Sequence, residues 1–198
     1  MSHPRKVVAQ VNVSIDGYSA GSPDDGMGGM AFLQEHASHE QMSTYFEGVW
    51  RGADTAVVGR TNYEGFAGFW PPVAEDPDAS PRDRDLATWL CTVEKVVFSR
   101  TLDKVEWQNS RLATQDPAAE IRDLKNTPGR DILVLNSASI IRQLLAADLI
   151  DELRISLLPA TLGGGLRLFE GNPPYTTWHL GGVATLTTGA VILHYQRP

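Results

Sequence analysis

Short apolar runs alternate along this chain with segments of helical pattern, and this alternation constrains the fold more than any other feature. The runs have the length of strands and are rich in β-branched residues. They are residues 55–58, 95–99, 131–135 and 152–158. The helical segments between the later runs are residues 118–125 and 139–147. An order of strand, helix, strand implies parallel pairing through right-handed crossovers.

The two ends of the chain complete the expected sheet. Apolar residues at every second position from 7 to 15 predict a first strand, and residues 39–50 have the three- and four-residue spacing of a helix. Residues 178–186 and 190–196 predict a closing antiparallel hairpin. Residues 71–84 are rich in proline and acid and lack periodicity, so we expect a long surface excursion there. The predicted fold is α/β, a mixed and mostly parallel sheet with helices on both faces and a C-terminal antiparallel hairpin.

The composition of the chain limits the number of domains and the classes of protein to which it can belong. With 198 residues, 42% hydrophobic and 21% charged, the chain has the size and balance of one globular domain, expected to span residues 1–198. A net charge of −7 opposes non-specific binding to nucleic acid, and no apolar run approaches the ~20 residues of a membrane span, so we expect a soluble, cytoplasmic protein. The single cysteine, Cys91, excludes an internal disulfide and a multi-thiolate metal centre. Only His36 and His39 approach a metal-ligand spacing, and we expect no metal.

Polar or basic residues follow three of the expected strands. Gly59-Arg60-Thr61, Ser99-Arg100 and Asn136 to Ser139 stand where a strand ends, and open α/β sheets bind ligands at the carboxyl ends of parallel strands. Taken singly, each has an ordinary explanation, such as a tight turn beside a surface arginine, or a helix cap at Ser137 or Ser139. Their coincidence favours a dinucleotide. No G-x-G-x-x-G fingerprint follows the first strand and no P-loop occurs, which disfavours standard NAD folds and P-loop NTPases.

Motifs in a fixed order along almost the whole chain resemble a known family. They are Val13-Ser14-Ile15-Asp16-Gly17-Tyr18, Gly59-Arg60-Thr61-Asn62-Tyr63-Glu64, Val96 to Leu102, Leu133 to Ser139, and Leu149 to Leu153 followed by Gly163-Gly164-Gly165 and Leu168-Phe169. In this order they resemble the dihydrofolate reductase-like superfamily, and within it the reductase domain of riboflavin-biosynthesis deaminase-reductases and its stand-alone relatives. The deaminase module itself is missing, since its zinc-binding signatures do not occur.

The resemblance implies NADPH as cofactor and hydride transfer as reaction. It implies that Gly59, Arg60 and Thr61 hold the cofactor phosphates and that Ser99 and Arg100 lie near the 2′-phosphate, which selects NADPH over NADH. The loop of Asn136, Ser137, Ala138 and Ser139 would cradle the pyrophosphate. Asn12, Asp16 and Gly17 would line the nicotinamide. These assignments are expectations carried over by position.

The residues expected to bind the substrate differ from those of dihydrofolate reductases. Those enzymes place a carboxylate on the first helix, whereas this chain has Ser43 there, with Glu47 one turn away. The riboflavin branch, which reduces a ribose ring, does not need that acid. Ser43, Glu47, Gly163, Gly164 and Gly165 are therefore the candidate substrate residues. The substrate is either a phosphoribosylamino-pyrimidine or an unrelated small carbonyl or imine, and a phosphate would need a second anion site, for which Arg154 and Arg167 are candidates.

Alternatives stay open at this point. Asn136-Ser137 stand where relatives carry adjacent glycines, which favours a catalytically silent nucleotide-binding or regulatory protein on the same fold. A dihydrofolate reductase-type or a flavin- or deazaflavin-dependent reductase is a further alternative. The exposed hydrophobic strand within residues 183–194 predicts a homodimer.

Overall fold

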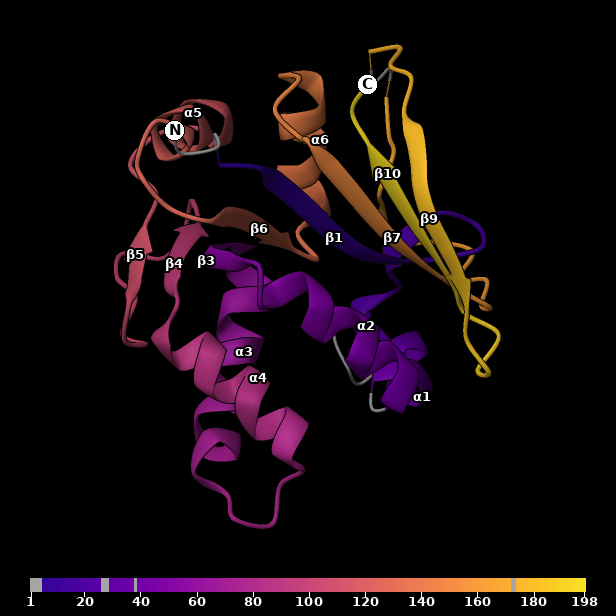
Figure 1. The fold of residues 1–198 in the computed structure, drawn as a ribbon, viewed down its shortest axis with the longest axis horizontal. Helices are drawn as coiled ribbons and strands as arrows, with labels where there is room; N and C mark the ends of the chain where they lie inside the picture. Colours follow the sequence, from indigo (N-terminus) through magenta and orange to yellow (C-terminus); the bar gives the residue numbers. More distant parts are fainter. Residues whose placement is uncertain (1–4, 26–28, 38, 172–173) are drawn as a thin grey trace.

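The computed structural model describes residues 5–25, 29–37, 39–171 and 174–198. Within them, eight strands form one sheet in the order β5-β4-β3-β6-β1-β7-β10-β9 (Figure 1). Its strands are β1 (Val7–Ser14), β3 (Ala53–Gly59), β4 (Glu94–Phe98), β5 (Ser110–Leu112), β6 (Asp131–Leu135), β7 (Glu152–Leu158), β9 (His179–Thr185) and β10 (Val191–Gln196). Neighbours from β5 to β7 pair in parallel, and β10 pairs antiparallel with both β7 and β9. The predicted fold class is confirmed.

Helices cover both faces of this sheet, because its central strands β3, β6 and β7 carry buried apolar residues on both sides. In Figure 1, α5 (Pro117–Lys125) and α6 (Ala138–Ala146) lie on one face, and α2 (Glu40–Trp50), α3 (Arg60–Glu75) and α4 (Pro81–Thr92) lie on the other. Each face has its own hydrophobic cluster, one built around α5 and α6 and one around α2, α3 and α4. None of the described helices is long and apolar enough to cross a membrane.

The first strand is more deeply buried than its alternating sequence suggests. Val7, Ala9, Val11 and Val13 pack in the cluster beneath α6, as one face of the predicted strand, but Ile15 lies beyond the end of β1 and is 61% exposed. The other face of β1 carries polar residues, among them Gln10, and turns them toward α2 rather than toward solvent. A buried polar face on a central strand indicates a site.

The surface excursion predicted for residues 71–84 is wrong. Helix α3 continues through Pro71 and Pro72 to Glu75, and α4 begins at Pro81, so the connection between the two helices is only residues 76–80. The start of α4 carries an ordinary helix signal that the proline and acid content obscured: Ser80 caps the helix, a proline follows, and Asp83 stands in the first turn. The α3–α4 hairpin forms one wall of the cavity described below.

Three short strands were also not anticipated. β5 is only three residues long, and β2 (Tyr18–Ala20) and β8 (Leu166–Arg167) form a separate two-stranded antiparallel sheet. Such brief segments have too few residues for a period to show in the sequence.

We expect Ser80→Ala to lower the free energy of unfolding by about 1 kcal/mol, the usual contribution of a serine N-cap. The hydroxyl of Ser80 accepts a hydrogen bond from the Asp83 N–H at 3.1 Å and lies 2.8 Å from the Asp83 carboxylate, and both interactions are lost. Urea unfolding measures the change. Ser22→Ala, at a hydroxyl in an exposed loop, is the matched control and should change little. Equal stability of Ser80→Ala and the parent would contradict the role of this cap.

Candidate functional site

Two helices begin side by side at the carboxyl edge of the sheet, and both leave their N-termini uncapped. α3 follows β3 with Gly59 at its N-cap, and α6 follows β6 with Ser137 at its N-cap; neither cap makes a side-chain hydrogen bond, and neither first turn contains an acid. The other long helices differ, because α2, α4 and α5 each have a capping side chain and an acid in the first turn. Free N–H groups and the positive end of the helix dipole therefore meet at the junction of β3 and β6.

Ser137 joins these two strand ends instead of capping α6. Its hydroxyl accepts a hydrogen bond from the Gly59 N–H at 2.9 Å and donates one to the Leu135 carbonyl at 2.7 Å. Ser137, one of the two serines that could have capped this helix, therefore makes no side-chain cap. The bond to Gly59 fixes the distance between the starts of α3 and α6, which makes the pair of N-termini one rigid feature.

Asparagines complete the junction. The Nδ2 of Asn62 donates to the carbonyls of Leu135 at 3.1 Å and Asn136 at 3.0 Å, and the Oδ1 of Asn136 accepts from the Asn12 N–H at 2.9 Å. Asn136 has φ +44°, a left-handed conformation that glycine adopts readily and asparagine tolerates better than most residues. The turn after β6 is thus left-handed without a glycine, and Asn136 also ties β1 to it.

Of the basic residues at this edge, Arg60 and Arg100 differ in their contacts. Arg60 pairs with Glu64 one helical turn along α3, at 3.1 Å, and both side chains are about half exposed. Arg100 follows β4, is exposed, and makes no ion pair with any described residue. Before it, the Ser99 hydroxyl accepts from the N–H groups of Thr101 and Leu102 and so holds the turn. Arg100 is therefore presented on a fixed turn with its charge unpaired.

The Asp16 carboxylate connects the end of β1 to the glycine run at residues 163–165. The Asp16 carboxylate accepts from the Ser14 hydroxyl at 2.6 Å and from the Gly163 N–H at 2.7 Å. These bonds, with the Ser14 hydroxyl the largest cause, lower the pKa of Asp16 to about 2. Gly165 has φ +119°, and a Cβ there would lie 2.1 Å from the Ala20 carbonyl oxygen. Gly165 thus lets the chain before β8 approach β2 closely, and a ligand-binding role for Gly163, Gly164 and Gly165 stays a prediction.

Asp16→Asn should lower the melting temperature at neutral pH, because an amide presents N–H donors to groups that already donate. The folded pKa is depressed, so the carboxylate stabilises the fold above its ordinary pKa of 3.8, and this contribution disappears as the pH falls toward 2. The gap in melting temperature between parent and variant should therefore be full above pH 4 and close between pH 4 and 2. Calorimetry across that range measures it, with Asp103→Asn at an exposed acid as control. A gap that does not depend on pH would refute the assignment.

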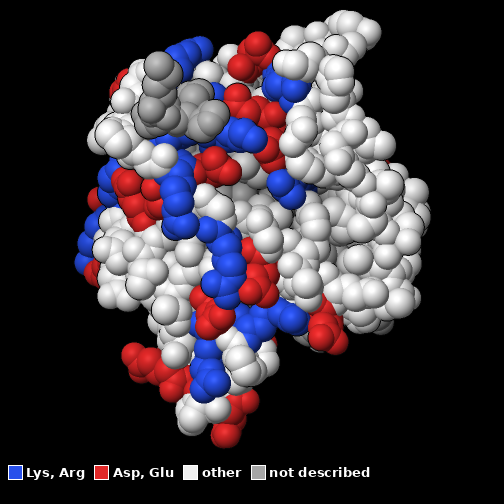
Figure 2. Space-filling view, viewed as in Figure 1, with Lys and Arg blue, Asp and Glu red and all other residues white. Residues whose placement is uncertain are grey.

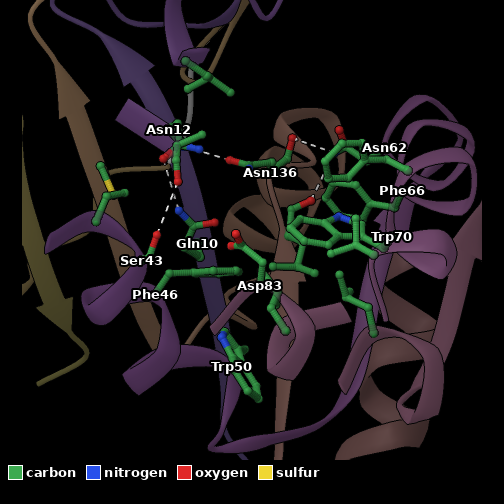
Figure 3. A pocket seen from close by; sticks show the side chains of 18 of the residues that line it. Gln10, Asn12, Ser43, Phe46, Trp50, Asn62, Phe66, Trp70, Asp83 and Asn136 are labelled. Atoms are coloured by element: carbon green, nitrogen blue, oxygen red, sulfur yellow. Dashed lines mark hydrogen bonds between the residues drawn. The ribbon is translucent and has the colours of Figure 1, made fainter. Parts of the chain in front are cut away.

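A cavity of about 450 Å³ opens between the sheet and the helices α2, α3 and α4, within the size range of small-molecule sites. Figure 3 shows its side chains: the amides of Gln10 and Asn12 from β1 and of Asn136 just after β6, with aromatic rings from α2 and α3 around them. The lining residues with polar side chains are Gln10, Asn12, Ser43, Asn62, Arg82, Asp83 and Asn136. The aromatic ones are Phe46, Trp50, Phe66, Phe69 and Trp70. The cavity therefore reaches the junction at Asn12, Asn62 and Asn136.

Of the candidate substrate residues, Ser43 lines this cavity and the glycine run does not. Glu47, one turn along α2, is also outside the lining and is held by Arg51 at 2.7 Å and Arg82 at 3.6 Å. The acid that does line the cavity is Asp83, from the start of α4. Within the part of the chain that is described, no group of three or more histidine, cysteine or acidic residues could hold a metal ion.

The sequence analysis did not identify most of the residues that line the cavity, although the spacing of some of them indicates a helix face. Phe66, Phe69, Trp70 and Val73 recur at three- and four-residue spacing, which predicts an apolar stripe along one face of a helix. The sequence analysis did not identify this stripe, and an excursion was expected from residue 71 onward. Gln10 carries no such signal, since a glutamine on a strand is ordinarily solvated.

Strand order, helix placement and the junction at the carboxyl edge define a reductase-like α/β fold of the dihydrofolate reductase type. The chain belongs to the RibD C-terminal domain family, whose model matches residues 5–192. The match covers all of the strands of the large sheet except the last residues of β10. The predicted family is confirmed.

Comparison with individual proteins supports the same fold. The uncharacterized protein YyaP of Bacillus subtilis (strain 168) is 27% identical over 200 residues, 97% of this chain and 95% of YyaP. A putative riboflavin biosynthesis protein from Shewanella sp. PV-4 superimposes with a TM-score of 0.72 at 22% identity, covering 98% of this chain and 99% of that one. Dihydrofolate reductase from Enterococcus faecalis, in complex with NADP(H) and RAB-propyl, gives 0.62 at 13% identity, covering 100% and 99%.

Proposed function

We propose that this protein is an NADPH-dependent reductase that transfers hydride to a small molecule bound in the cavity beneath α2, α3 and α4. The observation that carries the proposal is the pair of uncapped helix N-termini at the junction of β3 and β6. A phosphate would supply the acceptors and the negative charge that both N-termini lack. The complex of the Enterococcus faecalis enzyme with NADP(H) supports a nicotinamide cofactor on this fold.

The proposed cofactor site runs along the carboxyl edge of the sheet. Gly59, Arg60 and Thr61 at the start of α3, with Ser137, Ala138 and Ser139 at the start of α6, would hold the phosphates. Gly59 has φ −81°, and an added Cβ would meet nothing closer than the Ser137 Oγ at 3.7 Å. The fold itself therefore does not require glycine here, and a close approach of the cofactor would explain it.

Hydride transfer needs the reacting atoms close together and water excluded. When bound, NADPH supplies a hydride from C4 of its nicotinamide, so a substrate with a C=O or C=N bond plus one proton yields the reduced product and NADP⁺. We place the nicotinamide by Asn12, Asp16 and Gly17, where β1 ends. Asn12 also lines the cavity, so a ring held there would border the substrate. The aromatic walls keep water from that boundary.

The substrate has two candidate classes. The reaction of the riboflavin branch, reduction of 5-amino-6-(5-phosphoribosylamino)uracil, is one, and reduction of an unrelated small carbonyl or imine is the other. Asn136-Ser137 do not favour a silent protein, because the left-handed turn after β6 is formed without glycine.

Arg100→Ala should weaken NADPH binding by tenfold or more and leave NADH binding nearly unchanged, because the unpaired guanidinium is proposed to meet the 2′-phosphate that only NADPH carries. Nicotinamide fluorescence during titration measures both affinities. Arg122→Ala, at an exposed arginine on α5, is the matched control and should bind both nucleotides as the parent does. Equal loss for both nucleotides would remove Arg100 from the 2′-phosphate site, and no binding of either to the parent would overturn the reductase proposal.

A homodimer through β9 is the second part of the proposal. β9 is an edge strand, and its side chains are exposed along nearly its whole length, with Leu180 57% and Val183 62% exposed. Figure 2 shows few charged side chains on the side where β9 and β10 lie, whereas lysines, arginines and acids are interspersed over the rest of that view. An apolar edge strand with unpaired backbone groups is a template for pairing with a second copy.

Val183→Lys should shift the protein from dimer to monomer, since a charge at the centre of the exposed strand would be buried in the interface. Light scattering after gel filtration should give twice the 21.6 kDa chain mass for the parent and the single mass for the variant. Leu166→Lys, at a residue of β8 that is 40% exposed, is the control and should stay dimeric. A monomeric parent, or a dimeric Val183→Lys variant, would exclude this interface.

A further inference from the structure

We propose that the cavity takes an uncharged, planar, conjugated ring that presents an N–H or O–H donor to Gln10, and that it does not take a phosphorylated substrate. This inference rests on the proposed function, because it names the substrate class of the same site. Three observations carry it: the aromatic walls, the state of the charges around the cavity, and a buried acceptor on β1 that has no partner.

The walls suit a flat ring. Phe66 and Trp70 of α3 face the cavity from one side, and Phe46 and Trp50 of α2 from another (Figure 3). Aliphatic side chains fill the gaps between these rings; they are Leu33, Met42, Val73, Leu86 and Leu90. Aromatic faces and edges stack on planar conjugated rings, so the walls suit the ring of a substrate and offer nothing to a ribose phosphate attached to it.

The charges around the cavity oppose a phosphate. Among the described lining residues, Arg82 is the one cation and Asp83 the one acid. Arg82 is ion-paired with Glu47, with its Nε 3.6 Å from that carboxylate, and its Nη1 donates to the Glu40 carbonyl at 3.4 Å. Its Nε is buried and has no hydrogen-bond partner among the described residues. A phosphate would have to meet Asp83 and remove Arg82 from Glu47. Burying a charge without a free partner is strongly unfavourable.

The two arginines suggested by sequence as a second anion site do not change this balance. Arg154 is bound to the Glu152 carboxylate at 2.9 Å, and Arg167 lies over the Tyr18 ring at 4.5 Å and bonds its hydroxyl. Neither lines the cavity. A phosphoribosyl group would therefore find no unpaired cation among the described residues of this site.

The side chain of Gln10 supplies a hydrogen-bond acceptor for the ligand. It is only 4% exposed, its Nε2 donates to the Asn12 Oδ1 at 3.3 Å, and its Oε1 has no hydrogen-bond partner among the described residues. Figure 3 shows the side-chain amide of Gln10 reaching into the cavity beside Asn12. A buried acceptor without a partner is costly, and a ligand donor would remove that cost. The competing partner is the Nε of Arg154, across the β1–β7 pairing, which also lacks a partner.

Isatin, an uncharged bicyclic ketone with a ring N–H, and N-methylisatin, which lacks that donor, form a matched pair of probes. Reduction of isatin at C3 would consume one hydride from NADPH and one proton, and would convert C=O to CH–OH. Calorimetric titration of each probe into the protein without cofactor measures binding independently of turnover. We expect saturable binding of isatin, affinity for N-methylisatin lower by about tenfold, and no competition from ribose 5-phosphate.

Gln10→Leu is the matched variant and should bind the two probes equally, at the affinity of N-methylisatin or tighter. The comparison of probes on the parent protein does not depend on whether that variant folds. Equal affinity of the parent for both probes would overturn the role of Gln10. Displacement of isatin by ribose 5-phosphate, or no isatin binding, would overturn the substrate class. If the probes behave as expected and NADPH does not bind, the reductase proposal fails while the ligand class stands.

Discussion

The hydrogen bond from the Gly59 N–H to the Ser137 hydroxyl is the interaction on which the organisation of the site depends. It joins the ends of two neighbouring parallel strands directly, and the Asn62 side chain reinforces it by bonding the carbonyls at the end of β6. Because Ser137 is used between strands, it cannot cap α6, and the glycine before α3 has no side chain with which to cap. Two helix N-termini are thereby held together and left open, an arrangement that concentrates positive potential at one point.

The second determinant is the buried polar face of β1. A central strand of an α/β sheet is usually apolar on both sides. Here Gln10 and Asn12 interrupt that rule on the side facing α2, and the α3–α4 hairpin extends outward to enclose them. The end of β1 therefore lies by the proposed cofactor site, and its middle forms the floor of the cavity. A reductase needs such adjacency, since cofactor and substrate must meet at one boundary.

The sequence predicted the parallel core well, because strands such as residues 131–135 and 152–158 are buried on both faces and are bounded by clear turns. The prediction was wrong at residues 71–84. The two prolines within α3 and the acidic residues at the start of α4 are typical of a loop, but these residues belong to a hairpin of two helices. Local composition there opposes a helix, and the packing of Phe66, Trp70 and Leu86 against the hydrophobic cluster of α2, α3 and α4 overrides it.

The candidate site was only partly accessible from sequence. Strand-end residues such as Gly59 and Asn136 could be picked out because the ends of parallel strands share an edge. Asp83 could not, because its place in the cavity depends on the path of the misread hairpin. Gln10 could not either, because only the tertiary structure reveals that its acceptor is buried and unpaired.

A crystal structure of the protein soaked with NADPH would show whether the two helix N-termini bind the cofactor. We expect density for the pyrophosphate between the N-termini of α3 and α6, the 2′-phosphate beside Arg100, and the nicotinamide next to Asn12 at the mouth of the cavity. A nucleotide bound elsewhere on the molecule, or an empty edge at saturating NADPH, would contradict the proposed cofactor site.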